Sequence, residues 1–250
     1  MKALKFKLSG KTAFFKKPEV NSYLYFTYGN IHRVALLGMF GAILGYGGYN
    51  QQRYKMENNK GYKEDYPEFY SKLSNLKIAI EPLNEKGYIP KKVQVFNNSV
   101  GYYNKDKDEK PCNLVVNEQW LENPKWNIYV LMDCEEANKI SEYIINSKTV
   151  YQPYLGKNDH YADISSYKIV DAREVEEIEK IDSLCPTRLI ELDINSEEDG
   201  QFKYTEKLPV ALDKESNMYR LEGFIYSNMN IESIKLENIY NIEEKNIVFF

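Results

Sequence analysis

The chain has 250 residues, of which 43% are hydrophobic and 28% charged, ordinary values for a folded soluble protein. At this length it can bury a sizeable core without disulfide staples. Its three cysteines are far apart and form no CxxC pair, which excludes zinc-ribbon and thioredoxin-like motifs and favours a reduced, cytoplasmic setting.

The formal net charge of −4 is spread unevenly along the sequence. Residues 1–60 carry ten basic and two acidic side chains, whereas residues 134–250 carry thirteen basic and twenty-four acidic ones. We expect the basic front to attract a polyanion. We expect the acidic third of the chain, residues 134–250, to face protein partners or open solvent. The alternative is that scattered lysines only solvate one face.

Residues 3–10, ALKFKLSG, alternate apolar and basic side chains. Leu4, Phe6 and Leu8 would lie on one face of a strand, and Lys5 and Lys7 on the other. The pattern predicts a half-buried strand with an open basic face. A basic, aromatic loop follows, and it contains Lys11, Lys16, Lys17 and Asn21.

Residues 31–44 are apolar nearly all round and predict a buried helix, capped by Asn30 and ended by Gly45 or Gly47. The apolar run is shorter than the about 20 residues that a membrane span needs, and it is rich in glycine. Gly38, Gly41, Ala42 and Gly45 recur at spacings of three and four. They predict a side of the helix to which a sheet or chain approaches closely.

His32 and Arg33 would lie in the first turn of this helix, where the dipole disfavours cations by roughly 0.3–1 kcal/mol. Free backbone N–H groups at that end bind anions. Together these features predict a phosphate site at Arg33. A solvated arginine is the alternative.

Further along, residues 77–81, 127–133 and 162–175 have strand patterns, and residues 135–147 predict an amphipathic helix. Between the first two strands, residues of about 84–122 predict a protruding hairpin with a charged tip. The order strand, helix, strand, strand, helix, strand predicts an α+β fold with a ferredoxin-like, RNA-recognition-like βαββαβ core. After Glu174 the composition turns acidic, and short strands predict a smaller β-rich part. We therefore predict a core over residues 1–173 and an extension over residues 174–250.

Four stretches, taken in chain order, resemble the Cas-five family of CRISPR-associated proteins, most closely its type I-B branch. They are LKFKLSGKTAFFKKPEVNS, HRVALLGMFGAILGYGGYNQ, YQPYLGKNDHYADI and EKLPVALD. The first two motifs are quite specific, and the resemblance spans nearly the whole chain.

This resemblance implies a RAMP protein with a thumb hairpin and a C-terminal extension, without a cofactor or a metal. Its role would be to bind the 5′ handle of the guide RNA in Cascade, the multi-subunit antiviral surveillance complex. Its partners would be the large subunit and the backbone subunits. The resemblance does not decide whether the protein also contacts target DNA near the PAM, and it implies no contact with a membrane. The residues predicted to bind RNA are Lys11, Lys16, Lys17, Asn21, His32, Arg33, Tyr46, Asn50, Lys91, Lys92, Lys157 and His160.

An endoribonuclease that cuts the CRISPR repeat, as relatives in the type I-C branch do, is the alternative function. Metal-independent RNA cleavage needs a general base and a general acid. Only His32 and His160 are ordinary bases near neutral pH. A lone histidine is more often structural, and type I-B systems resemble ones with a separate repeat-cutting enzyme. We therefore expect no catalytic residue.

Overall fold

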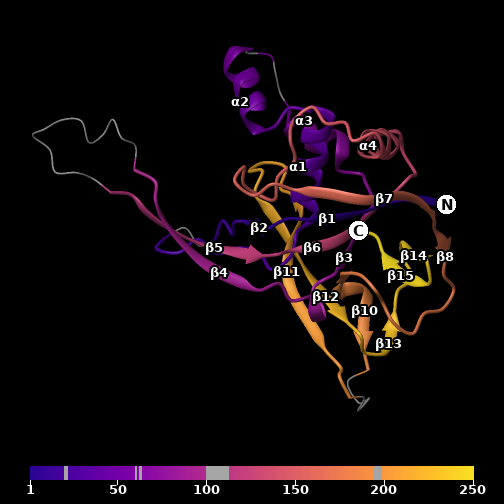
Figure 1. Cartoon of the computed structure of the whole chain (residues 1–250). Coiled ribbons are helices and arrows are strands. Elements are labelled where there is room, and N and C mark those ends of the chain that lie inside the picture. Colours follow the sequence, from indigo (N-terminus) through magenta and orange to yellow (C-terminus); the bar gives the residue numbers. More distant parts are fainter. Residues whose placement is uncertain (20–21, 60, 62–63, 100–112, 194–198) are drawn as a thin grey trace, which may run out of the picture.

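The computed structural model describes residues 1–19, 22–59, 61, 64–99, 113–193 and 199–250. Figure 1 shows a body of several small sheets from which one hairpin projects. The helices are α1 Arg33–Leu44, α2 Tyr49–Asn58, α3 Glu68–Leu73, α4 Glu135–Ile145 and the 3-10 turns η1 Glu85–Gly87 and η3 Thr187–Leu189. The strands are β1 Lys2–Ser9, β2 Thr12–Ala13, β3 Ile78–Pro82, β4 Lys91–Asn97, β5 Val115–Glu122, β6 Lys125–Leu131, β7 Asp163–Asp171, β8 Arg173–Glu174, β9 Cys185–Pro186, β10 Ile190–Leu192, β11 Lys203–Leu212, β12 Tyr219–Ser227, β13 Ile231–Ile234, β14 Ile239–Ile242 and β15 Lys245–Val248.

The central sheet has the strand order β3-β6-β1-β7, and every neighbouring pair is antiparallel. Strands β1 and β3 therefore run parallel with β6 between them, and β6 and β7 run parallel with β1 between them. These are two interleaved split βαβ units, connected through α1 and α4. The chain order agrees with the predicted order, with α2 and α3 added after α1. The molecule is thus a mixed α+β fold with several antiparallel sheets.

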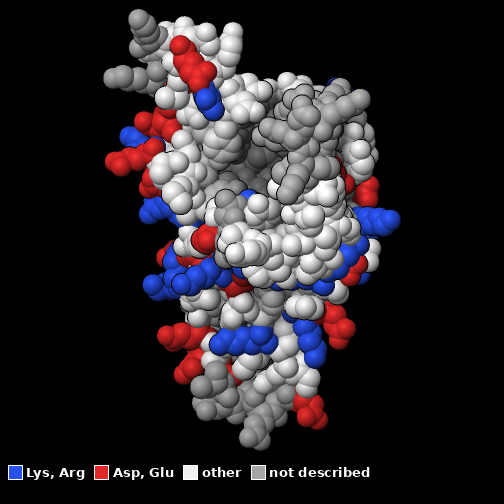
Figure 2. All heavy atoms as spheres, turned by 90° about the vertical axis from the view of Figure 1, so that its left-hand side faces the viewer, with Lys and Arg blue, Asp and Glu red and all other residues white. Residues whose placement is uncertain are grey.

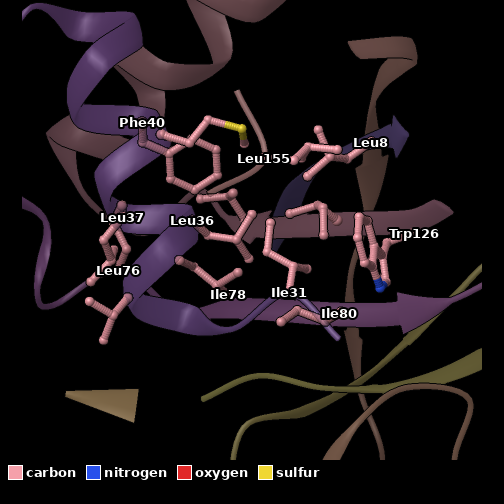
Figure 3. Close-up of a cluster of buried hydrophobic side chains, with 14 of the residues drawn as sticks. Leu8, Ile31, Leu36, Leu37, Phe40, Leu76, Ile78, Ile80, Trp126 and Leu155 are labelled. Atoms are coloured by element: carbon pink, nitrogen blue, oxygen red, sulfur yellow. The ribbon is translucent and has the colours of Figure 1, made fainter. Parts of the chain in front are cut away.

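The main core lies between α1 and the central sheet. Figure 3 shows Leu36, Leu37 and Phe40 of α1 in one cluster with Ile78 and Ile80 of β3. All five side chains are fully buried, in keeping with a helix that is apolar nearly all round. Among the described residues, no helix is long and apolar enough to cross a membrane.

The start of α1 differs from the prediction by two residues. The N-cap is His32, whose Nδ1 accepts a hydrogen bond from the N–H of Ala35 at 3.2 Å. Asn30, the predicted cap, instead accepts from Trp126 Nε1 at 2.9 Å and donates to the carbonyl of Gly87 at 3.3 Å. The predicted end is confirmed, because Gly45 is the C-cap with a left-handed φ of 80°.

The small residues of α1 serve two different neighbours. A Cβ at Gly41 would lie 2.5 Å from Cβ of Phe69 on α3, so the predicted close approach is confirmed there. A Cβ at Gly38 would have Cε2 of Phe69 as its nearest neighbour, at 4.0 Å. The close approach predicted for the whole stripe is therefore wrong at Gly38, which borders open space.

This contrast predicts opposite effects of one substitution at two positions. Gly41→Ala should lower the free energy of unfolding by about 1 kcal/mol, since overpacking outweighs the gain in helix propensity. Gly38→Ala should raise it by roughly 0.5–1 kcal/mol, because the same gain comes without a clash. Urea unfolding of both variants measures the difference, and equal shifts would contradict the tight helix contact.

The second face of the central sheet is covered by the C-terminal strands. Lys5, predicted to lie on an open basic face, pairs with Glu243 at 2.7 Å, and its side chain is only 15% exposed. That prediction is wrong because β14 and β15 pack on this face through a second apolar cluster that includes Tyr129 and Phe249. The acidic third therefore also neutralises lysines of the basic front, in addition to facing solvent.

Residues of the C-terminal part also enter the main core. Leu208, Leu212 and Phe224, from β11 and β12, are buried in the same cluster as α1. The predicted boundary near residue 173 stays a prediction, and both sides of it share one core.

The predicted hairpin is formed by β4 and β5, which pair antiparallel and project from the body (Figure 1). Short strand β2 extends this sheet on the body side. The charged tip lies outside the described residues. On the outer face Val93 and Val95 are each 55% exposed and Val115 is 59% exposed.

Candidate nucleic-acid interface

A cleft of about 690 Å³ opens beside α1. Its floor is α1 and His32, and its walls come from residues 14–16, the first turn of α2, residues 151–156 and β12. The lining residues are Phe14, Phe15, Lys16, His32, Val34, Ala35, Gly38, Met39, Ala42, Tyr46, Gly48, Tyr49, Asn50, Gln51, Phe69, Tyr151, Tyr154, Gly156 and Tyr219. Its size lies within the range of about 300–1,000 Å³ that is usual for ligand sites.

A glycine turn between α1 and α2 forms one wall. The left-handed Gly45 lets the N–H of Tyr46 return to the carbonyl of Gly41 at 2.8 Å. The N–H of Gly47 donates to the carboxylate of Glu68 at 2.9 Å, and this bond, first among several causes, lowers the pKa of Glu68. The turn is therefore fixed to α3, and α2 begins at the cleft.

The loop of residues 151–156 forms the opposite wall. The N–H of Tyr151 donates to the carbonyl of Ala42 at 3.1 Å, and the N–H of Phe14 donates to the carbonyl of Leu155 at 3.1 Å. Gly156 has a left-handed φ of 87°, and a Cβ there would meet the carbonyl oxygen of Phe14 at 2.0 Å. Glycine is needed at this position because the loop and residues 12–15 touch through their backbones.

His32 is only 3% exposed and lies among the rings of Phe15, Tyr28 and Tyr219. Burial lowers its pKa to about 3, so the imidazole is neutral at pH 7. Since Nδ1 accepts from Ala35, the ring proton is on Nε2. No described residue accepts a hydrogen bond from that Nε2–H.

The chemistry of the cleft is aromatic and weakly basic. Tyr49 and Tyr154 are each 46% exposed and Tyr151 is 56% exposed. Lys16 is the one cation among the described lining residues, and none of them is acidic. Figure 2 shows the hairpin side of the molecule hollowed below α2, with mostly uncharged side chains around the hollow. Aromatic walls with a nearby cation suit unstacked bases and a phosphate.

Four predicted RNA-binding residues, Lys16, His32, Tyr46 and Asn50, line this one cleft. Lys11 is exposed beside β2. Lys17 pairs with Glu206 at 3.4 Å. Asn21 lies outside the described residues.

Arg33 does not lie in the cleft. Its guanidinium donates to the carbonyls of Ser74 at 2.6 Å, Leu76 at 2.8 Å, Phe250 at 3.1 Å and Val210 at 3.2 Å. These bonds engage four of its five N–H donors. The predicted phosphate site at Arg33 is wrong in this geometry, and so is the solvated alternative. Arg33 joins three distant segments of the chain.

Lys157 and His160 lie at the root of the hairpin. Lys157 pairs with the buried Glu118 at 3.2 Å, and Nδ1 of His160 lies 2.6 Å from Oγ1 of Thr12. His160 is 1% exposed and packs edge-on against Trp120, so it is not displayed to a strand of RNA. Its pKa is lowered, chiefly by burial.

The two hairpin lysines differ from each other. Lys92 pairs with Glu122 at 3.4 Å. Lys91 is half-buried, and burial lowers its pKa. Neither lines the cleft.

Sequence reasoning missed the tyrosine walls, namely Tyr49, Tyr151, Tyr154 and Tyr219. Tyr49 ends the GYGGY run, and the YQPY stretch contributes two of the others, so both motifs carried a local signal. With 22 tyrosines in the chain, tyrosine identity alone could not single them out.

No protein-family model matches the chain, and no curated protein matches it in sequence. In structure it is similar to a chain of a CRISPR RNA-guided surveillance complex, with a TM-score of 0.53 and 17% identity over 92% of this chain and 90% of that chain. A CRISPR protein from Archaeoglobus fulgidus gives a TM-score of 0.48 and 14% identity over 99% and 98% of the two chains. The first of these similarities shows that the two chains share a fold, here a mixed α+β fold.

Proposed function

We propose that the protein is a non-catalytic, RNA-binding subunit of a CRISPR RNA-guided surveillance complex. In this proposal it is a RAMP protein of the Cas-five family, type I-B branch, with a ferredoxin-like core over residues 1–173 and an extension over residues 174–250. The 5′ handle of the guide RNA occupies the cleft and the adjoining loop of residues 11–17.

The observation that carries the proposal is the composition of the cleft. Tyrosines from three separate segments converge with Lys16 and the amides of Asn50 and Gln51, without an acidic lining residue in the described part of the chain. Sequence-tolerant binding of single strands combines these ingredients, namely aromatic platforms and basic side chains along the backbone path. The shared fold with a chain of an RNA-guided complex supports the same conclusion.

The histidines favour binding over cleavage. The imidazole of His32, with a pKa of about 3, is a weak base, and its Nδ1 is already used as a helix cap. His160 is buried against Trp120. Incubation of the purified protein with end-labelled repeat RNA, without added metal, should therefore give a shifted band of intact RNA on native and denaturing gels. Specific cleavage products would show an endoribonuclease instead.

Electrostatics of the loop give a quantitative prediction. If Lys11 and Lys16 each neutralise a phosphate, the K11A/K16A double variant should reduce the salt slope, d log K/d log[salt], by about 1.4, or 0.7 per contact for single strands. Lys17→Ala should change it less, because Lys17 does not line the cleft, whereas Lys16 does. Fluorescence anisotropy across a salt series measures the slope. Lys214→Ala, an exposed lysine of the C-terminal part, is the control, and an equal change there would remove the loop from the RNA site.

The hairpin and the extension are the proposed protein contacts. The exposed valines on the outer face of β4 and β5 favour packing against a neighbouring subunit. The backbone and large subunits of the complex are the proposed partners.

A further inference from the structure

We propose that the cleft is a pocket for one unstacked base of single-stranded RNA, held between tyrosines and read by the Nε2–H of His32 as a hydrogen-bond donor. This inference rests on the proposed RNA-binding function and adds the ligand and its recognition. It requires a base that presents an acceptor at the floor of the pocket.

The floor leaves room for a flat ligand. Ala35, Gly38 and Ala42 succeed one another at spacings of three and four along α1, and all three line the cleft. The space above Gly38 is open, because a Cβ placed there would have its nearest neighbour 4.0 Å away. Gly41, which does not line the cleft, is instead packed against Phe69. The small residues of α1 therefore have two roles. Gly41 allows close packing against α3, whereas Gly38 leaves space at the floor of the cleft.

The walls supply stacking surfaces. Tyr151 and Tyr154 come from one loop, and Tyr49 begins α2 on the other side of the glycine turn. Each keeps roughly half of its surface exposed although a cleft adjoins it. Stacking of a base on such a ring contributes about 1–3 kcal/mol by alanine substitution. Stacking on these rings therefore offsets the stacking free energy that a base loses when it leaves its neighbours in the RNA strand.

The polar groups point to a nucleotide rather than to a purely apolar ligand. His32 lines the cleft and is only 3% exposed, yet its Nε2–H lacks a partner among the described residues. This nitrogen is not among the fully buried atoms that lack a partner in the described part of the chain, so it is accessible from the cleft and can donate to an acceptor bound there. The first turn of α2, Lys16 and the amide of Asn50 line the same cleft and suit the phosphate next to the base.

A cleft-filling variant tests the pocket. Gly38→Leu should fold, because its Cβ has room, but its side chain should occupy the floor. We expect its affinity for a short unpaired oligoribonucleotide to fall at least tenfold, with a thermal midpoint no lower than that of the unchanged protein. Tyr154→Ala should give a similar loss. Tyr54→Ala, a 68% exposed tyrosine of α2 outside the cleft, should bind normally.

A second variant tests the donor. His32→Asn keeps a side-chain acceptor for the helix cap and removes the ring that reaches the cleft. In the unchanged protein we expect affinities for oligomers of A, C, U and G to differ. His32→Asn should erase this preference while RNA still binds. A preference that survives in His32→Asn would overturn the recognition by the imidazole.

The same preference should stay constant between about pH 5.5 and 8, since the pKa of His32 lies well below that range. The titratable side chains that face it, Tyr28 and Tyr219, have pKa values raised chiefly by burial, so they stay neutral there too. Lys16 is the charged side chain that lines the same cleft. A preference that rises on acidification through about pH 6.5 would mean that a charged imidazole reads the base, against the proposal.

The base pocket and the proposed RNA-binding function can be disproved separately. If Gly38→Leu and Tyr154→Ala bind RNA as tightly as the unchanged protein, with the same salt slope, RNA binding stands and the base pocket is wrong. If the unchanged protein binds no repeat RNA in low salt, the proposed function is wrong.

Discussion

Replacing Arg33 by alanine should lower the free energy of unfolding by on the order of 3 kcal/mol or more. The guanidinium donates to the carbonyls of Ser74, Leu76, Val210 and Phe250, at 2.6–3.2 Å. Alanine leaves all four acceptors without this partner. Each hydrogen bond from a charged donor contributes about 1.5–3 kcal/mol, and the losses within one cluster are not additive.

Chemical denaturation of Arg33→Ala and Arg33→Lys measures this effect. Lysine keeps the charge but has one nitrogen, so it cannot span the four carbonyls and should be intermediate. Arg53→Ala is the matched control, because the Arg53 side chain is 80% exposed and pairs with Glu57 on its own helix. Its midpoint should not move. RNA affinity of Arg33→Ala, measured below its midpoint, should be unchanged, and a stable variant with weak RNA binding would restore Arg33 to the RNA site.

The contacts of Arg33 could not be predicted from local sequence patterns. Apolar periodicity located α1, α4 and the four strands of the central sheet, because burial on a helix or strand repeats locally. The position of Arg33 in a first turn suggested exposure to solvent. The carbonyls that it binds come from residues 41 to 217 positions away, and no local pattern encodes that convergence.

The sequence predicted individual residues of the cleft but not the cleft itself. Lys16, His32, Tyr46 and Asn50 are predicted individually as RNA-binding residues, and the fold brings them together in one cleft. The sequence did not predict that the loop of residues 151–156 lies against α1. This contact depends on backbone interactions at Ala42 and at Gly156, which have no local sequence pattern.

The covering of the central sheet was missed for a related reason. Alternating lysines usually mean a solvated face. Here Lys5 lies over the ring of Tyr129 and pairs with Glu243, which is 238 positions away. A lysine stem packs well on apolar surface while its ammonium is paired, so alternation alone does not distinguish an open face from a covered one.

Replacement of Glu81 should give the second large loss of stability. This residue of β3 is 3% exposed, and its carboxylate accepts from the hydroxyl of Tyr129 at 2.6 Å and from Nδ2 of Asn127 at 2.7 Å. It also pairs with Nζ of Lys245. The carboxylate thus connects β3, β6 and β15 beneath the C-terminal strands. Every partner is a donor, so no neutral side chain of similar shape can replace it fully.

We expect Glu81→Gln to lower the free energy of unfolding by about 2–3 kcal/mol. Its amide keeps one acceptor oxygen but presents an NH₂ group to donors. Most of the loss should come from Tyr129, whose ring is fully buried. The pKa of its hydroxyl is raised by burial and then by Glu81, so it remains a donor at all ordinary pH values and needs an acceptor in the folded chain.

Urea unfolding of Glu81→Gln, of Tyr129→Phe and of the double variant isolates this contact. Tyr129→Phe removes the donor and leaves the ring in place, so the double variant should lose less stability than the two single variants together. Glu135→Gln is the matched control, since that side chain is 76% exposed and pairs with Lys139 on its own helix, and its midpoint should stay where it is. Losses that simply add would mean that Tyr129 is satisfied without the carboxylate. The connection from β3 to β6 would then rest on the strand pairing and on the hydrogen bond from Asn127.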